Sequence, residues 1–319
     1  MIIETKKIKT KSPFVLACWP GMGEVSYKAG LFLKESLAFE EFAYIDSQRF
    51  FLPQSVIVNK GVVNLPPLPE ERFYIYKGKG KPLILFLSNS QPPADKYYGY
   101  AQGIVSFLKR FKPQEVFTFA SIPQPIEHIQ DYKVWLSSTH REILEKFKKY
   151  NLPLLNEGQI AGLNGLFLGI CKEQGLKGVC LLGEIPLYTI QIENPKASKN
   201  ILEIFCDYLG LKVDFSPLVE RQRLLDEHIE RLMEIIRNGG DLSQVSDRPL
   251  DEKDIENIKK DLSAFVKLPQ SARKRIEELF KEAKENISKA TILKQELDKW
   301  GVYQEYEDRF LDLFRKRKH

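Results

Sequence analysis

The stretch from Asn156 to Tyr188 constrains the fold of this 319-residue chain more than any other segment. Gly158, Gly162 and Gly165 fall near the start of a run whose apolar residues recur at helical spacing. A glycine in a helical turn costs about 1 kcal/mol relative to alanine, so three of them indicate close backbone approach rather than helix propensity. Gly175 then ends this helix as a left-handed cap.

A short apolar run, Val179–Leu182, follows the helix. Its length and its flanking glycines favour a strand that is buried on both faces. The run leads into Glu184-Ile185-Pro186, where the missing N–H of the proline opposes further pairing. The sequence therefore predicts a carboxylate at the carboxyl end of a buried strand, which is where open α/β sheets place ligand crevices.

Strand and helix signals alternate along the first two thirds of the chain. Apolar runs predict strands at residues 14–18, 42–46, 73–76, 83–87 and 115–120, and periodic segments predict helices at 24–37 and 97–111. A hairpin is expected over 56–63, with its turn at Asn59-Lys60-Gly61. The β-α-β order predicts an α/β fold, doubly wound, with a mainly parallel sheet and right-handed crossovers.

The character of the sequence changes around Ser216-Pro217, where strand signals stop. Apolar residues at helical spacing, among many Lys, Glu and Arg residues, predict amphipathic helices over 218–236 and 272–300. A polar segment at 243–254 is expected to form a loop. We therefore predict an α/β core domain over residues 1–217 and a helical extension over 218–319.

Composition excludes several classes of function. The net charge of +5, from 48 basic and 43 acidic residues, is too near balance to indicate a nucleic-acid partner. No run approaches the roughly 18 apolar residues of a membrane span, and the first residues lack the apolar core of a signal peptide. The four cysteines form no CxxC pair and are expected to be buried, reduced thiols. We expect a cytoplasmic protein with no membrane contact.

No complete cofactor or metal motif is present in the sequence. The four histidines lie far apart without HxxxH or HExxH spacing, so no metal site is expected. The segment Gly21-Met22-Gly23 follows a strand and half-matches a dinucleotide fingerprint, but Ser26 stands where the third glycine belongs. A structural turn, an interface or small-ligand loop, and a nucleotide site all remain open for this segment. We expect no bound cofactor.

Polar residues at the ends of strands and at a helix start suggest one crevice at an edge of the sheet. Glu157 and Asn164 also fit purely structural roles, as an acid at a helix start and as a partner for nearby backbone. No GxSxG nucleophile motif accompanies these residues. The candidate crevice or interface residues are Gly21, Gly23, Ser88, Asn89, Glu157, Asn164 and Glu184, and no catalytic residue is assigned.

The sequence from 158 to 165 and the run 181–186 resemble the proteasome assembly chaperone 2 family, as do Trp19-Pro20-Gly21-Met22-Gly23 and Pro195-Lys196-Ala197-Ser198. The resemblance covers about residues 1–218. It implies an α/β fold like that of nucleoside phosphorylases and hydrolases. Eukaryotic members chaperone assembly of the 20S proteasome α-ring, and members commonly form homo-oligomers. Many of the family's proteasome-linked members end in a hydrophobic-Tyr-any tail, from which the ending Phe314–His319 departs.

Two functions follow from these observations, and the sequence does not separate a third, a scaffold that only oligomerises, from the first of them. The first is a non-enzymatic, assembly-chaperone-like protein that binds protein partners: further copies of itself, a paralogue or proteasome subunits. The second is a small-ligand-binding protein or an enzyme of the phosphorylase/hydrolase-like fold that uses the carboxylates at the strand ends. A buried pocket containing a carboxylate of raised pKa favours the second function, and a filled apolar crevice opposes it.

Overall fold

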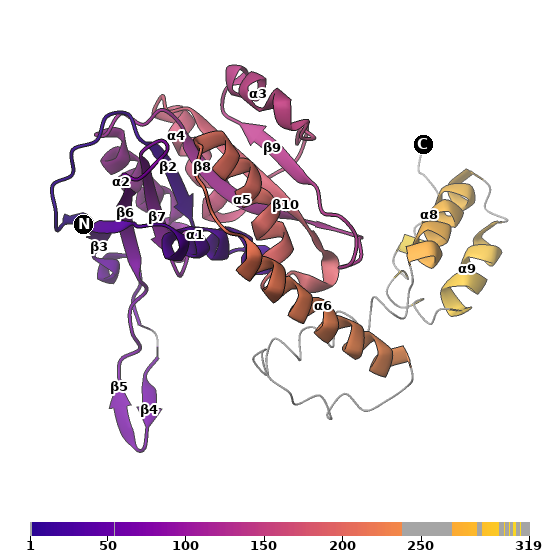
Figure 1. Cartoon of the computed structure of the whole chain (residues 1–319). Coiled ribbons are helices and arrows are strands. Elements are labelled where there is room, and N and C mark those ends of the chain that lie inside the picture. Colours follow the sequence, from indigo (N-terminus) through magenta and orange to yellow (C-terminus); the bar gives the residue numbers. More distant parts are fainter. Residues whose placement is uncertain are drawn as a thin grey trace, which may run out of the picture. The chain divides into compact units, whose positions relative to one another are not determined.

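The computed structural model describes residues 2–53, 55–237, 270–285 and 289–299, together with Tyr303, Tyr306, Arg309, Phe310 and Leu313. The chain divides into two compact units, Met1–Asp226 and Glu227–His319. The first unit holds the α/β fold, and the second holds helices (Figure 1). The boundary proposed from the sequence, at 217/218, falls at the start of helix α6, Ser216–Arg237.

An eight-stranded sheet forms the centre of the first unit, in the order β1-β3-β6-β7-β2-β8-β10-β9. Its strands are β1 (Ile2–Glu4), β2 (Phe14–Cys18), β3 (Glu40–Ile45), β6 (Glu71–Tyr76), β7 (Leu83–Ser88), β8 (Val116–Gln124), β9 (Val134–Ser138) and β10 (Gly178–Pro186). The four neighbouring strands β7, β2, β8 and β10 are parallel to one another. Antiparallel strands extend both sides of this parallel core, β6, β3 and β1 beyond β7 and β9 beyond β10.

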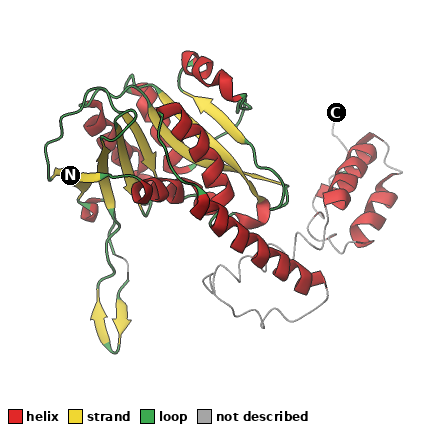
Figure 2. Ribbon diagram, viewed as in Figure 1, coloured by secondary structure: helices red, strands yellow, loops and turns green. Residues whose placement is uncertain are grey.

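Helices cover both faces of the sheet, as Figure 2 shows. They are α1 (Val25–Ser36), α2 (Tyr97–Lys109), α3 (Arg141–Phe147), α4 (Gly162–Glu173) and α5 (Pro195–Leu209). Alternate residues of β2 join different cores: Leu16 packs with α1 and α5, whereas Val15 packs with α2 and α4. This two-sided burial explains the continuous apolar runs of the central strands. The predicted α/β fold with a helical C-terminal part is confirmed.

The stretch 156–188 forms a helix and a fully buried strand of the sheet. All nine residues of β10 are buried, as the flanking glycines indicated. The strand continues through Pro186, four residues beyond the predicted end, and the N–H of Glu184 donates to the Lys133 carbonyl at 2.9 Å. Helix α4 begins only at Gly162, because positive φ angles at Gly158 and Gly162 keep the preceding loop out of a helix.

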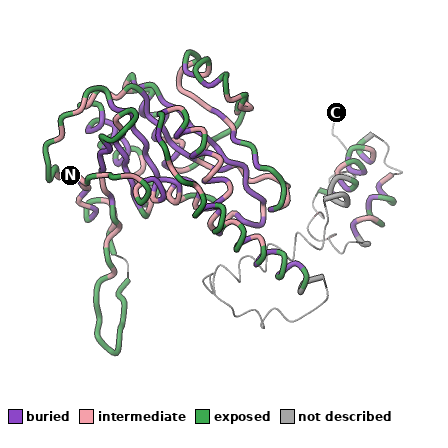
Figure 3. The backbone as a smooth tube through the Cα atoms, in the orientation of Figure 1, coloured by how far each residue is buried: buried purple, intermediate pink, exposed green. Residues whose placement is uncertain are grey.

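The predicted hairpin forms a separate two-stranded sheet, β4 (Ile57–Asn59) and β5 (Val62–Asn64). Gly61 has a φ of +80°, as the tight turn requires. All six strand residues are exposed, and Figure 3 shows this exposure along the whole hairpin.

After α6, the described residues of the second unit include a pair of packed helices. The segment predicted as one amphipathic helix over 272–300 is two helices, α8 (Gln270–Glu285) and α9 (Ala290–Lys299), which is a correction. Their apolar faces form one cluster around Ile276, Phe280 and Leu293. The predicted loop at 243–254 and the ending at 314–319 lie outside the described residues.

Candidate functional site

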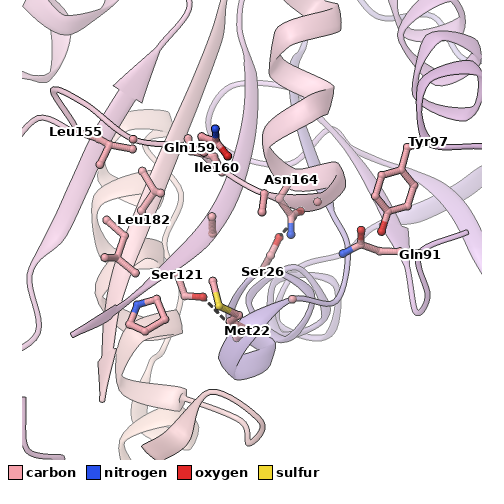
Figure 4. Close-up of a pocket in the computed structure, with 17 residues that line it drawn as sticks. Met22, Ser26, Gln91, Tyr97, Ser121, Leu155, Gln159, Ile160, Asn164 and Leu182 are labelled. Carbon is pink, nitrogen blue, oxygen red and sulfur yellow. Dashed lines mark hydrogen bonds between the residues drawn. The ribbon is translucent and has the colours of Figure 1, made fainter. Parts of the chain in front are cut away.

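A cleft of about 400 Å³ opens at the carboxyl end of the parallel core (Figure 4). Strands β8 and β10 form its floor with Ala120–Pro123 and Leu182. The loop after β2, with Gly21 and Met22, borders one side, and the loop 158–161 before α4 borders the other. The cleft therefore lies where an open α/β sheet places its binding crevices.

Asn164 joins the start of α4 to the loop after β2 and to α1. Its Oδ1 accepts hydrogen bonds from the Trp19 N–H at 3.3 Å and from Ser26 Oγ at 3.1 Å, and its Nδ2 donates to the Trp19 carbonyl at 3.3 Å. The Asn164 side chain is buried, with 5% of its surface exposed. Three bonds from one buried amide fix the position of both helix starts at the cleft wall.

Gln91, which follows β7, makes a second bridge across the same wall. Its Nε2 donates to the Pro20 carbonyl at 2.6 Å, and its Oε1 accepts from the Leu163 N–H at 3.1 Å. The first turn of α4 has no side-chain cap within its own segment, so Gln91 satisfies one of its unpaired amides. Sequence reasoning missed Gln91 because it stands in a loop 72 residues from the helix that it caps.

Gly165 allows the loop before α4 to approach the helix closely. A Cβ atom at this position would lie 1.8 Å from the Ile160 carbonyl oxygen. No side chain can be accommodated there without moving the backbone. The glycine pattern therefore shapes the loop that borders the cleft, as the sequence predicted for close backbone approach.

Among the described residues that line the cleft, none carries a charge. Met22, Ile160 and Leu182 provide apolar surface, and Ser121 donates its hydroxyl to the Met22 carbonyl at 2.7 Å. Gln159 adds an exposed amide and Tyr97 a half-buried phenol. Such a lining suits an uncharged surface with a few hydrogen-bonding groups, because no lysine or arginine is present to neutralise a phosphate.

The two predicted carboxylates lie outside this cleft. Glu184 is buried, and its oxygens accept hydrogen bonds from the Lys133 N–H and from Trp135 Nε1, both at 2.9 Å. Glu157 is exposed and lines a neighbouring hollow of about 380 Å³ together with Ser137. The structure thus separates the two acids from each other and from Asn164.

Among the remaining predicted residues, one lines the cleft and three do not. Gly21 lines the cleft, whereas Gly23, with a φ of +66°, is tied through its N–H to the Ile190 carbonyl at 2.6 Å. Ser88 Oγ donates to the Ser90 carbonyl at 2.7 Å, and Asn89 Oδ1 accepts from the Glu70 N–H at 2.9 Å. Neither residue lines the cleft. Of the seven predicted residues, the structure brings Gly21 and Asn164 together at the cleft.

Glu71 is a buried acid that the sequence analysis did not single out. Burial raises its pKa, opposed by hydrogen bonds from Tyr100, which donates to Oε1, and from Ser47. Ser47 Oγ lies 2.7 Å from Glu71 Oε2 and 2.9 Å from the Pro69 carbonyl oxygen. When Glu71 is neutral, its hydroxyl donates to Ser47 and the Ser47 hydroxyl donates to Pro69, so every group is satisfied.

The four cysteines are free and buried, as expected. Burial raises the pKa of each thiol to about 12, so all four are protonated at neutral pH. Across the described ranges, no cluster of His, Cys, Asp and Glu offers three ligands for a metal ion. No helix in those ranges has the length and apolar character needed to cross a membrane.

A family model described as the PAC2 family matches residues 15–233. The chain belongs to the PAC2 family. The resemblance seen in the sequence is therefore confirmed, and the match covers the whole wall of the cleft. An uncharacterized protein of Methanocaldococcus jannaschii is 26% identical over 263 residues, which make up 80% of this chain and 97% of that relative.

Solved structures of the PAC2 type share the fold. The archaeal proteasome activator PbaB of Pyrococcus furiosus aligns with a TM-score of 0.63 at 27% identity, over 73% of this chain and 98% of PbaB. PbaA of the same organism, an archaeal homolog of proteasome-assembly chaperone, aligns with a TM-score of 0.58 at 25% identity, over 75% of this chain and 94% of PbaA.

Proposed function

We propose that this PAC2-family chain is a non-enzymatic, assembly-chaperone-like protein that binds proteasome subunits in the cytoplasm and associates with further copies of itself. The observation that carries the proposal is the alignment with PbaB and PbaA over nearly their whole lengths, 98% and 94%. The first is a proteasome activator and the second a homolog of proteasome-assembly chaperone. The proposal transfers that class of partner to this chain.

The cleft supplies a surface for such a partner. Its uncharged lining favours an apolar protein segment, and Gln159 and Tyr97 can hydrogen-bond to the backbone of that segment. Met22 is 43% exposed at the border of the cleft and offers a flexible apolar contact. The bridges made by Asn164 and Gln91 hold this surface in place before binding, which lowers the entropic cost of association.

The test uses the purified full-length chain and unassembled proteasome α-subunits of the same source, with binding measured by isothermal titration calorimetry. Met22→Asp places a charge at the border of the uncharged cleft and is expected to weaken binding at least tenfold. The matched control is Val219→Asp, which changes a side chain that is 51% exposed on α6. Absence of binding by the unmodified chain, or equal binding by Met22→Asp, would contradict the proposal.

The cleft also supports a second candidate function, the binding of a small uncharged ligand. The specific observation is its volume of about 400 Å³, which lies in the range of ligand pockets. This cleft does not support the version of the function that used Glu157 and Glu184, because neither carboxylate lines it. Native mass spectrometry of the purified chain tests the ligand. A co-purifying small molecule that is lost in Ile160→Asp, a change at a half-buried residue of the lining, supports it, and an unliganded mass opposes it.

A further inference from the structure

Half of the large exposed apolar side chains in the described ranges lie in the β4–β5 hairpin and the segments next to it. Seven of the fourteen large apolar side chains that are exposed in the described ranges lie between residues 52 and 65. They are Leu52, Val56, Ile57, Val58, Val62, Val63 and Leu65, with exposed fractions from 49% to 71%. An apolar concentration of this kind in a soluble fold marks an interaction surface.

The apolar residues are distributed unequally between the two faces of the hairpin. Val58 pairs directly with Val63. Continuing the strand alternation one residue beyond β4 and β5 puts Val56 and Leu65 on the same face. Val58 is 62% exposed and Val63 is 61% exposed. The opposite face carries Ile57 and Val62 but also Asn59 and Asn64, because Ile57 pairs with Asn64 and Asn59 with Val62. One face is therefore wholly apolar, which is the pattern of a sheet that is covered on one side.

None of the described residues of the first unit covers this face, since Val58 and Val63 both stay more than half exposed. The hairpin is a sheet of two strands only, and it extends away from the body of the first unit (Figure 1). Pro53 precedes it, and Pro66, Pro67 and Pro69 follow it. Prolines in both connections stiffen the hairpin's base and remove N–H groups that could pair with another strand. An isolated two-stranded hairpin is marginally stable in water, so a further layer is needed to hold it.

We propose that a second copy of this chain covers the hairpin, with the two apolar faces packed against each other about a two-fold axis. Charge argues for this partner, because Lys60 is the only charged residue between 52 and 68. A surface without charge forms no ion pairs with a charged partner, whereas an apolar face can pack against an identical apolar face. Lys60 lies in the turn, so an antiparallel two-fold arrangement places the two lysines at opposite ends and avoids repulsion.

This interface refines the self-association included in the proposed function, and its test needs no proteasome subunit. Sedimentation velocity of the purified full-length chain over a concentration series measures self-association. The variant Val58→Lys/Val63→Lys places two charges on the apolar face, and the control Asn59→Lys/Asn64→Lys adds the same charge to the opposite face. We expect the unmodified chain and the control to associate, and the valine variant to shift the midpoint at least tenfold toward the monomer.

A cross-linking measurement checks the geometry independently. Packed sheets lie about 10 Å apart, so a short bis-maleimide can join cysteines on facing hairpins. The four native cysteines are buried, and Val58→Cys is expected to give a covalent dimer in high yield, whereas Asn59→Cys gives little. A monomeric unmodified chain, an unchanged midpoint in the valine variant, or equal cross-linking of the two cysteine variants would overturn the inference. Subunit binding that persists in Val58→Lys/Val63→Lys would leave the proposed function standing by itself.

Discussion

Replacing Asn164 by alanine removes the amide that joins α4 to the loop after β2. The change leaves the buried Trp19 N–H and carbonyl and the Ser26 hydroxyl without their partner. Each buried group left unsatisfied costs about 1–3 kcal/mol, and water entering from the adjacent cleft reduces this cost, so we expect a total loss of about 2–4 kcal/mol. For a unit of 226 residues (Met1–Asp226), this corresponds to a decrease in Tm of about 4–16 °C.

Urea unfolding followed by circular dichroism measures the loss, with Asn200→Ala as the matched control. Asn200 is a half-buried asparagine whose Nδ2 makes one hydrogen bond, to the Tyr132 carbonyl at 2.8 Å. Its replacement is expected to cost about 1 kcal/mol or less, since one partly exposed bond is lost. If Asn164→Ala were no more destabilising than this control, the proposed joining role of Asn164 would be wrong.

Three further predictions concern groups around the sheet. Because burial raises the pKa of Glu71 above its ordinary value of 4.5, the folded state holds the proton more tightly and stability falls as the pH rises above about 4.5 toward the raised pKa. Glu71→Gln keeps both hydrogen bonds, so it is expected to remove this fall in stability, which unfolding at pH 4.5, 6 and 8 measures. If the variant showed the same fall, a different titratable group would be its cause. Gly165→Ala brings a Cβ against the Ile160 carbonyl and is expected to cost about 2–4 kcal/mol, whereas Gly169→Ala, with open space at its Cβ, should be neutral or stabilising in chemical denaturation. Glu184→Gln turns an amide NH₂ toward Lys133 N–H or Trp135 Nε1, so a donor faces a donor, and is expected to lower the stability of the fold by about 1–3 kcal/mol. Subunit binding is expected to be unchanged, and a selective loss of binding in calorimetry would show that Glu184 belongs to the functional site.

Local patterns in the sequence were sufficient to predict the parallel core. The all-apolar run at 179–182 and the fully buried strand β2, whose alternate residues join two different cores, both follow from strands covered on two faces. The antiparallel pairing of β9 with β10 is harder to predict, because helices α3 and α4 lie between these strands and an intervening helix is typical of a parallel pair. Because Lys133 immediately precedes β9 and Trp135 lies near its start, the Glu184 carboxylate accepts hydrogen bonds from them instead of facing the cleft.

Local sequence patterns also predicted part of the candidate site. Gly21 reaches the cleft from the loop between β2 and α1, and Asn164 reaches it from the first turn of α4; sequence spacing reveals both positions. Ser88 and Asn89 also follow a strand, but their side chains bond within their own neighbourhood. Gln91, three residues after Ser88, reaches the cleft instead, and only the three-dimensional path of the loop shows which of these residues does so.

The most direct test of the chaperone-like function is an assembly reaction. Unassembled proteasome α- and β-subunits of the source organism are mixed with and without the purified full-length chain, and formation of the 20S particle is followed over time by native gel electrophoresis. The proposed function predicts a transient complex of the chain with unassembled subunits and faster or more complete formation of the particle. No complex, together with an unchanged time course at a saturating concentration of the chain, would contradict it.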